Sequence, residues 1–510
     1  MSTLTGVTLL YLCLAGVGVY LLKQVSAKKN RALYPPGPPG LPLIGNIQDL
    51  PHVKPWLTFA EWGKKYGDIT HINILGQHIF VLNSVKTTVE ILDRKSSLYS
   101  DRPFVPMSGE LMGYGQTLAY LRYGERFRLF RKNCHRVFGS RAAVVVYYPI
   151  EEIETHRLLK RVLAKPDQLQ AHLRHTAGAI ILRICYGYEV KDENDPLVDL
   201  AERSLDEFSR YGITGDFIVD FLPSLAKLPE WFPGAGFKRL ARECRKTVEE
   251  LAATPYEFVK DQMAAGIAPK SFASDLLKDH TLSVEEDHNV KWSAVSLFSG
   301  GADTTVSATY SFFLAMTLFP DVQKKAQAEI DAVVGPDRLP SYADRASLPY
   351  IEALAKEVLR WNVVIPTGVS DHSVIEDDIH NGYNIPKGSL VIPNIWFMLN
   401  DPQTYANPSE FNPERFLAKD GKEPETDPRA VCFGFGRRLC PGLHLADASI
   451  WITTAMSLAV FDVSKVVENG VEITPEVDHT SGLISHPKPF KCSIKARSDK
   501  ALALIQQDTQ

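Results

Sequence analysis

The sequence predicts a mainly α fold with a minor β portion, organised as a single large domain behind an N-terminal transmembrane helix. Apolar residues recur at helical spacing along most of the chain, whereas β-branched clusters bounded by turn residues occur in a few short segments. No linker, repeat or low-complexity run divides residues 41–497. The 510 residues are 45% hydrophobic and 23% charged, with a net charge of −4. This composition excludes disordered and collagen-like chains and does not favour a nucleic-acid-binding protein.

The first residues predict a membrane anchor. Ser2 to Leu22 is a run of 21 uncharged residues, which at about 1.5 Å per helical residue just crosses a hydrocarbon layer of roughly 30 Å. Basic residues such as Lys23 and Arg31 follow it, so the positive-inside rule keeps the rest of the chain in the cytosol. The alternative is a cleaved secretory signal, but its usual basic beginning is missing.

On this basis the chain divides into four parts. Residues 1–22 are the predicted anchor, residues 23–40 form a basic and proline-rich hinge, residues 41–497 form the folded body, and residues 498–510 are a C-terminal tail. The hinge carries four prolines between positions 35 and 39, which favours a stiff, non-helical spacer.

Within the body, local patterns predict individual elements in chain order. Residues 69–84 contain β-branched clusters interrupted by a glycine, as in a β-hairpin. Residues 321–334 show the apolar spacing of a helix bounded by proline and glycine. Short apolar runs alternating with turns predict a small sheet region across 374–393 and 471–494. Residues 443–460 predict a helix.

Residues 292–319 are unusually apolar, with Asp303 as their one charge and nine Ser or Thr residues. Length and hydropathy permit a second membrane span, but an ionisable group in such a segment normally faces a cavity or a partner. A long central helix buried in the body fits better. Gly300 and Gly301 cost it about 1 kcal/mol each relative to alanine, which indicates that the helix bends or lets a group approach its backbone.

One of the seven cysteines lies in a distinctive loop. Residues 433–442 (FGFGRRLCPG) hold Cys440 between glycines, directly before the predicted helix at 443–460. Backbone N–H groups, the helix N-terminus and the nearby Arg438 would lower the pKa of its thiol. The other cysteines form neither a CxxC pair nor a disulfide framework. The loop therefore predicts a reactive or metal-binding thiolate.

The pattern F-x-x-G-x-R-x-C-x-G over 433–442 resembles the haem-binding loop of the cytochrome P-450 superfamily. Two further motifs of that family precede it in the expected order, E-x-x-R at 357–360 and P-E-R-F at 413–416. The resemblance covers roughly residues 35–497 and implies the cytochrome P-450 fold. It also implies that Glu357, Arg360 and Arg415 form a structural triad behind the haem.

The resemblance implies haem b as the cofactor and Cys440 as the axial ligand of its iron. The cofactor contacts would then be Cys440, Arg438, Arg131, His372, Phe433 and Gly434. Two positions depart from the family pattern. Phe127 replaces the usual tryptophan, so an indole N–H donor is lost, and Asp371 replaces a proline, which brings a carboxylate near the haem propionates.

Residues 300–305 (GGADTT) match the oxygen-activation motif of the same family. Cleavage of bound oxygen needs protons delivered without flooding the site with water, and an acid beside a hydroxyl meets that need. The resemblance therefore implies that Asp303 relays protons and that the Thr304 hydroxyl lies beside bound oxygen. Hydrogen bonding within a helix is the alternative role of the pair.

Electrons would come from a separate protein, because the sequence contains no flavin or nucleotide fingerprint and no iron–sulfur cysteine run. The resemblance to microsomal members implies an NADPH–cytochrome P-450 reductase, with cytochrome b5 as a further candidate donor. It also implies a single-pass protein of the endoplasmic reticulum membrane whose catalytic domain faces the cytosol. Four basic residues predict a docking patch for the reductase: Arg128, Lys132, Arg136 and Arg437.

Family alignment predicts a substrate pocket lined by segments 101–121, 209–235, 295–304, 365–369 and 481–485. Its named contributors are mainly apolar: Phe104, Val105, Met107, Leu111, Phe298, Ala302, Ile365, Val369 and Leu483. This lining favours a lipophilic or aromatic small molecule.

Phrases at 228–239 and 436–446 resemble a mushroom secondary-metabolism group. That group is related to O-methylsterigmatocystin oxidoreductase-like enzymes and includes a tryptamine 4-hydroxylase, which suggests hydroxylation of a terpenoid, a polyketide or an indole.

These features predict a haem-thiolate monooxygenase that inserts one oxygen atom from O2 into a C–H bond. One alternative is a haem-thiolate isomerase or dehydratase that acts on a hydroperoxide without NADPH, although the intact Asp303 and Thr304 argue against it. The other is a haem- or lipid-binding protein without turnover, which the departures at Phe127 and Asp371 slightly favour.

Overall fold

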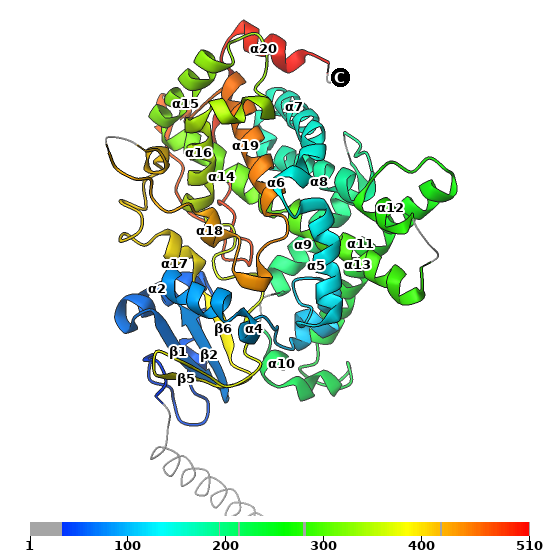
Figure 1. Ribbon diagram of the computed structural model, residues 1–510, viewed down its shortest axis with the longest axis vertical. Coiled ribbons are helices and arrows are strands. Elements are labelled where there is room, and N and C mark those ends of the chain that lie inside the picture. The colour runs from blue at the N-terminus through cyan, green and yellow to red at the C-terminus, as the bar shows by residue number, and fades with distance from the viewer. Residues whose placement is uncertain (1–32, 193, 213–214, 279–281, 419–420, 509–510) are drawn as a thin grey trace, which may run out of the picture.

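The computed structural model describes residues 33–192, 194–212, 215–278, 282–418 and 421–508. In this part of the chain helices dominate and strands form four small sheets, as the sequence predicts. Figure 1 shows the helices filling the upper and right-hand parts of the molecule, with the largest sheet at the lower left. The predicted anchor at 1–22 and most of the predicted hinge lie outside the described residues.

The largest sheet has the strand order β1-β2-β6-β3. Its first two strands, β1 (Ile69–Ile74) and β2 (Gln77–Leu82), form the predicted antiparallel hairpin, with Gly76 at a positive φ of 92° in the turn. The later strand β6 (Leu390–Pro393) pairs in parallel with β2, and β3 (His372–Ser373) pairs antiparallel with β6. Distant parts of the sequence therefore meet in this sheet.

The proline-rich segment at 34–40 packs against the hairpin and is not a free spacer. The Tyr34 ring stacks on His71 and His78, with ring centroids 4.8 and 5.0 Å apart. The His71 backbone N–H donates to the Pro36 carbonyl oxygen at 3.2 Å. A Cβ atom at Gly37 would lie 2.0 Å from the His71 carbonyl oxygen, so only glycine fits this approach. The folded body therefore begins inside the predicted hinge.

The central helix of the body is broken in the middle. It consists of α13 (Val284–Ala302) and α14 (Thr304–Leu318), separated at Asp303, which has φ −125° and ψ −31°. The helix begins at a capping box between Ser283 and Glu286. Helix α14 buries 12 of its 15 residues and α13 nine of its 19, which places the apolar segment inside the body, excludes the second membrane span and confirms a bent central helix.

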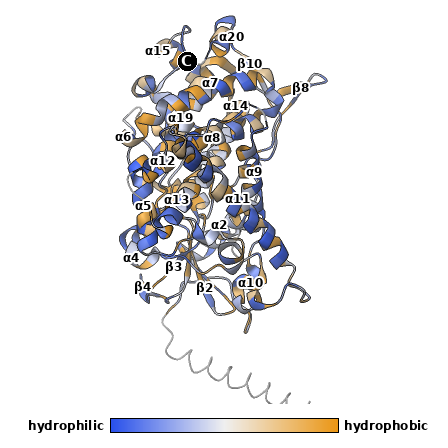
Figure 2. Cartoon of the chain, turned by 90° about the vertical axis from the view of Figure 1, so that its right-hand side faces the viewer, coloured by the Kyte–Doolittle hydropathy of each residue, from blue (hydrophilic) through white to orange (hydrophobic). Residues whose placement is uncertain are grey.

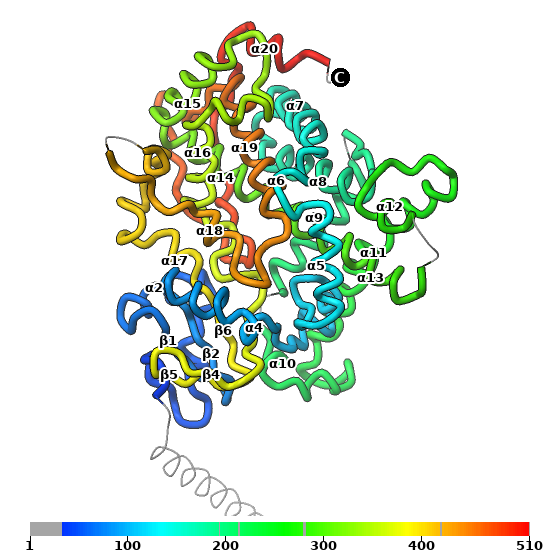
Figure 3. The backbone as a smooth tube through the Cα atoms, viewed as in Figure 1, coloured from blue at the N-terminus to red at the C-terminus, as the bar shows by residue number. Residues whose placement is uncertain are grey.

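Five further helices surround α14 or extend its layer: α7 (Tyr148–Ala164), α8 (Leu169–Tyr186), α15 (Pro320–Val333), α16 (Pro349–Trp361) and α19 (Leu443–Val460). The tube view shows α14, α16 and α19 side by side in the upper part of the molecule, where they pack on one another (Figure 3). Helices α15 and α19 confirm two sequence predictions. Among the described residues α19 is the one helix long and apolar enough to cross a membrane, and it is mostly buried in the core.

The other long helices are α2 (Pro55–Tyr66), α5 (Glu125–Phe138), α9 (Pro196–Tyr211) and α11 (Phe237–Ala264). Hydrophilic and hydrophobic residues alternate along surface helices such as α11, as expected of amphipathic helices packed on a core (Figure 2). The short helices are α3 (Val85–Thr88), α4 (Ser96–Tyr99), α6 (Arg141–Val144), α10 (Ile218–Phe221), α12 (Phe272–Leu277), α17 (Ile395–Leu399) and α18 (Arg429–Cys432).

The C-terminal part contains most of the small strands. The remaining strands are β4 (Asp378–His380), β5 (Tyr383–Ile385), β7 (Phe461–Ser464), β8 (Val466–Glu468), β9 (Val471–Ile473) and β10 (Ser493–Ala496). Strands β4 and β5 form an antiparallel hairpin around Asn381 and Gly382, within the sheet region predicted at 374–393. In the region predicted at 471–494, β9 and β10 pair with strands that begin earlier, at Val466 and Phe461.

The last described residues form a packed helix instead of the predicted tail. Helix α20 (Asp499–Gln506) buries Ala501, Leu504 and Ile505 against the core cluster that includes α7 and α19. These three residues share one helical face, and their burial extends the folded body beyond Arg497.

Candidate active site

A cavity of about 350 Å³ lies between the broken helix and the cysteine loop. Gly300, Gly301 and Thr304 line it from the helix break, and Phe433, Gly434 and Cys440 line it from the loop. The fold thus brings together two segments that the sequence analysis selected independently.

The cysteine loop is shaped by glycines and closed by one backbone hydrogen bond. Gly434 and Gly436 have positive φ values of 81° and 56°. A Cβ atom at Gly436 would lie 2.2 Å from the Leu92 carbonyl oxygen. The Cys440 backbone N–H donates to the Phe433 carbonyl oxygen at 2.8 Å. The loop therefore turns tightly enough to present Cys440 to the cavity.

The Cys440 thiol receives the predicted backbone hydrogen bonds, with the charge of Arg131 acting in place of that of Arg438, but burial outweighs these effects. The backbone N–H groups of Gly442 and Leu443, at the start of α19, donate to it and favour the thiolate, as does the charge of Arg131. Desolvation by burial is the largest effect and raises the pKa of Cys440. The predicted net lowering of this pKa is therefore wrong for the thiol itself. A metal ion that replaces the proton would stabilise the thiolate.

Four basic side chains line the same cavity: Arg102, Arg131, His372 and Arg438. Their hydrogen-bond partners are mainly backbone carbonyl oxygens. Arg438 donates to the carbonyls of Ser100, Leu118 and Leu121, Arg131 to Leu439, and Arg102 to Ala119, Ser370 and Asp371. The His372 ring bonds through Nδ1 to the Tyr99 carbonyl at 2.7 Å. These contacts fix the side chains without neutralising their charge.

The grouped cations destabilise one another. Burial, followed by the charge of Arg102, lowers the pKa of Arg438 to about 8. Burial lowers the pKa of Arg102 to about 10 and, with both arginines nearby, lowers that of His372 well below its usual value. An anionic ligand in the cavity would relieve this repulsion. The donor set therefore fits a group that carries two carboxylates, such as the propionates of haem.

The structure accommodates both departures from the family pattern. The Arg438 guanidinium lies 3.9 Å from the centre of the Phe127 ring, a cation–π contact that occupies the place of the missing indole donor. Asp371 lies close to Arg102, whose charge opposes the effect of burial, and the pKa of Asp371 is raised to about 6. Asp371 is absent from the residues that line the cavity.

The helix break places its two polar residues differently. The Thr304 hydroxyl donates to the Gly300 carbonyl oxygen at 2.7 Å, and Thr304 lines the cavity. A Cβ atom at Gly300 would meet no atom within 4 Å, which leaves the cavity open at this turn. Asp303 does not line the cavity, and its Oδ2 lies 2.9 Å from Nε2 of His486. The predicted acid is therefore behind the cavity wall, one residue from the hydroxyl.

The triad implied by the sequence is assembled and buried. Arg360 donates to both carboxylate oxygens of Glu357, at 2.7 and 2.8 Å, and Arg415 donates to Glu357 Oε1 at 3.2 Å. Glu357 and Arg360 are fully buried. Further bonds from the two guanidinium groups reach carbonyls of the segment 399–410. The triad thus ties α16 to the chain that leads into the cysteine loop.

The predicted pocket lining is only partly correct. Ile365, Val369 and Leu483 line the cavity as predicted. Phe104 is 59% exposed, and Phe298 is fully buried on another face of α13, where its ring meets Tyr186 edge-on. Helix α9 contributes Ser204, Leu205 and Phe208 in place of residues from 209–235. The predicted segment 101–121 does line the cavity, but through Tyr114, Leu118 and Tyr120.

Two residues near the site were missed by sequence reasoning. Arg102 was the one cation in an otherwise mostly apolar loop that was already expected at the pocket, and this could have indicated it. His486 follows the predicted lining segment 481–485 directly, but nothing in the local sequence connects it with Asp303.

Comparison with known proteins gives consistent matches over nearly the whole chain. A family model for cytochrome P-450 matches residues 35–494. The cytochrome P-450 monooxygenase 208 of Postia placenta is 52% identical over 475 residues, which cover 93% of this chain and 92% of the relative. The monooxygenase claR of Ampulloclitocybe clavipes is 48% identical over 508 residues, covering 99% and 94%, and ppsD of Aspergillus oryzae is 41% identical over 506 residues, covering 98% and 95%.

Proposed function

The chain belongs to the cytochrome P-450 family and is an oxidoreductase of the monooxygenase type, and we propose that it inserts one oxygen atom from O2 into a C–H bond of a lipophilic or aromatic small molecule. The observation that carries this proposal is the single cavity lined both by Cys440 and by Thr304, with a group of cations on the same walls.

We assign haem b, the cofactor that the family implies, to this cavity. Cys440 would bind its iron through the thiolate, the propionates would lie among the cations, and the loop backbone would contact the ring. The proposed contacts are Cys440, Arg102, Arg131, His372, Phe433, Gly434 and Arg438. Bound there, a haem with a thiolate ligand supplies the redox chemistry that activates O2 and cleaves its O–O bond.

The polar residues at the helix break, Asp303 and Thr304, would deliver protons to the ligand in the cavity. The Thr304 hydroxyl faces the cavity while its proton bonds to the Gly300 carbonyl, so its oxygen can accept a hydrogen bond from a group in the cavity. Asp303, at the adjacent position, would supply protons from behind the wall. Gly300 leaves space for a ligand over this turn. Apolar side chains around them would keep bulk water out.

The lining supports an uncharged or aromatic substrate. Among the described residues that line the cavity, the charged side chains are the three arginines assigned to the propionates. The distal portion is formed by apolar groups such as Leu205, Phe208 and Leu483, with the hydroxyls of Ser204 and Ser299 as polar points. We therefore propose a terpenoid, a polyketide or an indole as substrate, within fungal secondary metabolism.

We propose that electrons arrive from NADPH through a separate cytochrome P-450 reductase, with cytochrome b5 as a further donor. The basic residues Arg128, Lys132 and Arg136 are exposed at intervals of four along α5, and Arg437 is exposed in the cysteine loop. Arg437 and Arg128 meet around Tyr123, with guanidinium-to-ring distances of 5.0 and 5.8 Å. This basic surface next to the thiolate loop suits an acidic electron-transfer partner.

We further propose that residues 1–22 anchor the protein in the endoplasmic reticulum membrane as a single span, with the body in the cytosol. Family members of this kind are often membrane-bound. The chain enters the folded body along β1, where residues 34–40 are fixed, so the anchor would hold the body by its largest sheet.

The first test concerns the thiolate. Cys440→Ala should lose the thiolate-shifted Soret band of the reduced, CO-bound protein, because it removes the proposed thiolate ligand. Cys432→Ala is the matched control, since Cys432 also lines the cavity, and it should keep the band. An unchanged band in Cys440→Ala would contradict the assignment.

The second test concerns turnover. The chain, expressed in yeast with a fungal reductase, should convert at least one fed terpene, polyketide or indole to a product that is heavier by one oxygen atom. Product formation without NADPH would instead support the isomerase or dehydratase alternative, and a protein that binds haem but converts none of them would support the binding-protein alternative.

A further inference from the structure

A histidine outside all the assigned motifs contacts the acid at the helix break. His486 Nε2 lies 2.9 Å from Asp303 Oδ2, and the two side chains are 11% and 13% exposed. The two residues are 183 positions apart in the sequence. Thr304, the neighbour of Asp303, lines the cavity. The histidine is therefore bonded to the proposed proton donor on the side that faces away from the cavity.

The position of the imidazole is fixed by its own loop. The His486 backbone N–H donates to the Thr480 hydroxyl oxygen at 3.0 Å, and the Thr480 backbone N–H donates to the His486 carbonyl at 2.8 Å. The Ser307 hydroxyl, on α14, donates to the Ser485 carbonyl at 2.6 Å. These bonds attach the loop at 480–486 to the same helix that begins after Asp303, so the contact is built into the fold.

The second ring nitrogen is unused. His486 Nδ1 is buried and has no hydrogen-bond partner among the described residues. An unpaired buried ring nitrogen is costly in a purely structural contact, and such groups call for an explanation. One ring nitrogen thus bonds to the acid, while the other can still accept or donate a proton.

Two other charged residues, Glu202 and Arg174, lie near Asp303 and His486, but the hydrogen bond to Asp303 comes from His486. Glu202 of α9 is near enough for the charge of Asp303 to contribute to its raised pKa, after burial and together with Asp199. Arg174 of α8 opposes this effect at Glu202. Arg174 thus compensates Glu202, and His486 provides the hydrogen bond that orients Asp303.

We propose that His486 is a positioning residue for proton delivery, which holds the Asp303 carboxyl group in place behind the helix break through the hydrogen bond at its Nε2. The proposal rests on the proposed monooxygenase function. Without the imidazole, the carboxyl group would lose this bond and with it the orientation that proton delivery requires.

The test compares two variants of the full-length, haem-loaded enzyme with its reductase. His486→Phe should keep the thiolate-shifted CO band but lower the fraction of NADPH electrons that reach product on the order of tenfold. This is less than the roughly 10²–10⁴-fold contribution of a proton donor itself, because Asp303 remains in the variant. His486→Gln, whose amide can still donate to Oδ2, should recover much of the coupling.

A readout independent of turnover tests the contact itself. In thermal melting followed by circular dichroism, His486→Phe and Asp303→Asn should be non-additive, because each removes the same hydrogen bond. His479→Phe is the matched control. His479 is in the same segment and also has an unpaired buried ring nitrogen, but it is bonded to nothing at the helix break.

The outcomes separate the two proposals. Wild-type coupling in His486→Phe at every pH, additive melting shifts, or equal uncoupling in His479→Phe would each overturn the role of His486. Absence of both the CO band and NADPH-dependent product in the unmodified enzyme would instead overturn the proposed function. If His486→Phe does not fold, His486→Ala takes its place, and coupling in His486→Ala equal to that of the unmodified enzyme would contradict the proposal.

Discussion

At the scale of single residues, the cavity contains cations without matching anions. Arg102 is 7% exposed and donates to three backbone carbonyls, which hold its guanidinium at the cavity wall. Its charge also lowers the pKa of Arg438. Buried charges of one sign are tolerated where a ligand of the other sign binds. Arg102 should therefore add little to the stability of the protein without haem and more to that of the haem-bound protein.

We expect Arg102→Leu to weaken haem retention several-fold, because charge-assisted hydrogen bonds are worth about 1.5–3 kcal/mol. The rate of haem transfer to apomyoglobin measures this effect. Arg122→Leu is the control, since Arg122 is 70% exposed and pairs with Asp101 on the surface. Equal haem loss in both variants would show that Arg102 has no special role.

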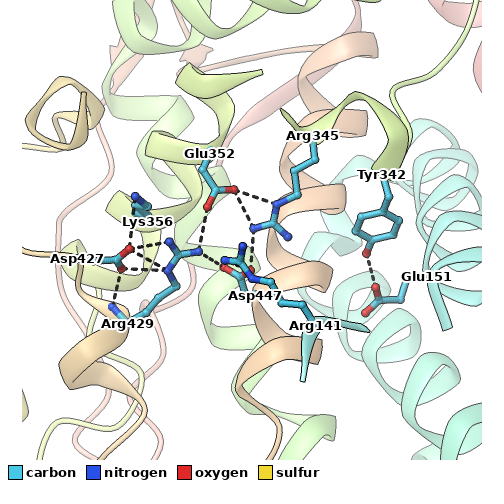
Figure 4. A network of polar contacts seen from close by, with 9 residues as sticks. All are labelled: Arg141, Glu151, Tyr342, Arg345, Glu352, Lys356, Asp427, Arg429 and Asp447. Carbon is cyan, nitrogen blue, oxygen red and sulfur yellow. Dashed lines mark hydrogen bonds and ion pairs between the residues drawn. The ribbon is translucent and has the colours of Figure 1, made fainter. Parts of the chain in front are cut away.

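A buried carboxyl group far from the cavity makes stability depend on pH. Glu151 is fully buried, accepts hydrogen bonds from Tyr342 and Ser449, and burial raises its pKa to about 7. Figure 4 shows the Tyr342 hydroxyl pointing at this carboxyl group. In the unfolded chain a glutamate has a pKa of about 4.3. Between these two values the folded state binds more protons, so its stability falls as the pH rises.

Glu151→Gln should abolish that pH dependence, because an amide does not ionise. The free energy of unfolding of the variant relative to the unmodified protein should rise between about pH 5 and pH 7, with a limiting slope of about 1.4 kcal/mol per pH unit. Melting temperatures measured across this pH range follow the same trend and check it. The exposed Glu472→Gln should leave the curve unchanged. A pH-independent difference between the two proteins would refute the buried acid as its source.

At the scale of secondary structure, local patterns predicted the elements that depend on neighbours in the sequence. The β1–β2 hairpin follows from β-branched residues around Gly76, and α19 coincides with the predicted helix at 443–460. The bend at Asp303 was indicated by Gly300 and Gly301. Periodicity did not reveal which face of α13 meets the cavity, and Phe298 was therefore misplaced.

The two glycines at the bend should respond differently to a methyl group. A Cβ atom at Gly300 would meet nothing within 4 Å, whereas one at Gly301 would lie 3.0 Å from the Ile181 side chain. Gly300→Ala should therefore gain helix propensity of about 1 kcal/mol. Gly301→Ala should offset that gain through crowding of about 1–3 kcal/mol. The melting temperature of Gly300→Ala should therefore exceed that of Gly301→Ala. The opposite order would contradict the close approach of Gly301 to Ile181 of α8.

At the scale of the whole molecule, long-range contacts create the site, and the sequence does not display them. The Arg102 bond to Ser370 spans 268 positions and the His486 bond to Asp303 spans 183. No spacing rule connects residues so far apart. Motifs predicted Cys440 and Thr304 because a family resemblance supplied the missing geometry, whereas residues outside those motifs could be assigned only from the fold.

One such long-range network fixes both ends of the cysteine loop (Figure 4). Arg429, at the start of α18, contacts Glu352 of α16 at 2.9 Å and Asp447 of α19 at 2.7 Å. Arg345 contacts the same two carboxylates, at 2.8 and 2.7 Å. Helix α18 precedes the loop and α19 follows it. Both flanks are thereby attached to α16, the helix that carries the buried triad.

Removal of the central cation should therefore loosen the loop as well as the network. In Arg429→Met, Glu352 keeps Arg345, Asp447 keeps Arg345 and the more distant Arg141 at 3.9 Å, and Asp427 keeps Lys356 at 3.4 Å. The cost of breaking a buried pair is about 3–5 kcal/mol, and we expect somewhat less because the Arg429 side chain is 15% exposed. The melting temperature should fall. The thiolate-shifted Soret band of the reduced, CO-bound protein should decrease, because the thiolate is no longer held at the iron.

The matched control is a bidentate pair at the surface. Arg338 contacts Asp344 at 2.6 Å but is 51% exposed, so Arg338→Met should cost less than about 1 kcal/mol and leave the CO band intact. If both variants melt alike, or if Arg429→Met loses stability while its CO band stays normal, the network stabilises the fold without controlling the cysteine loop. A selective loss of the band in Arg429→Met is the result expected of a network that holds the thiolate in place from the far side of the loop.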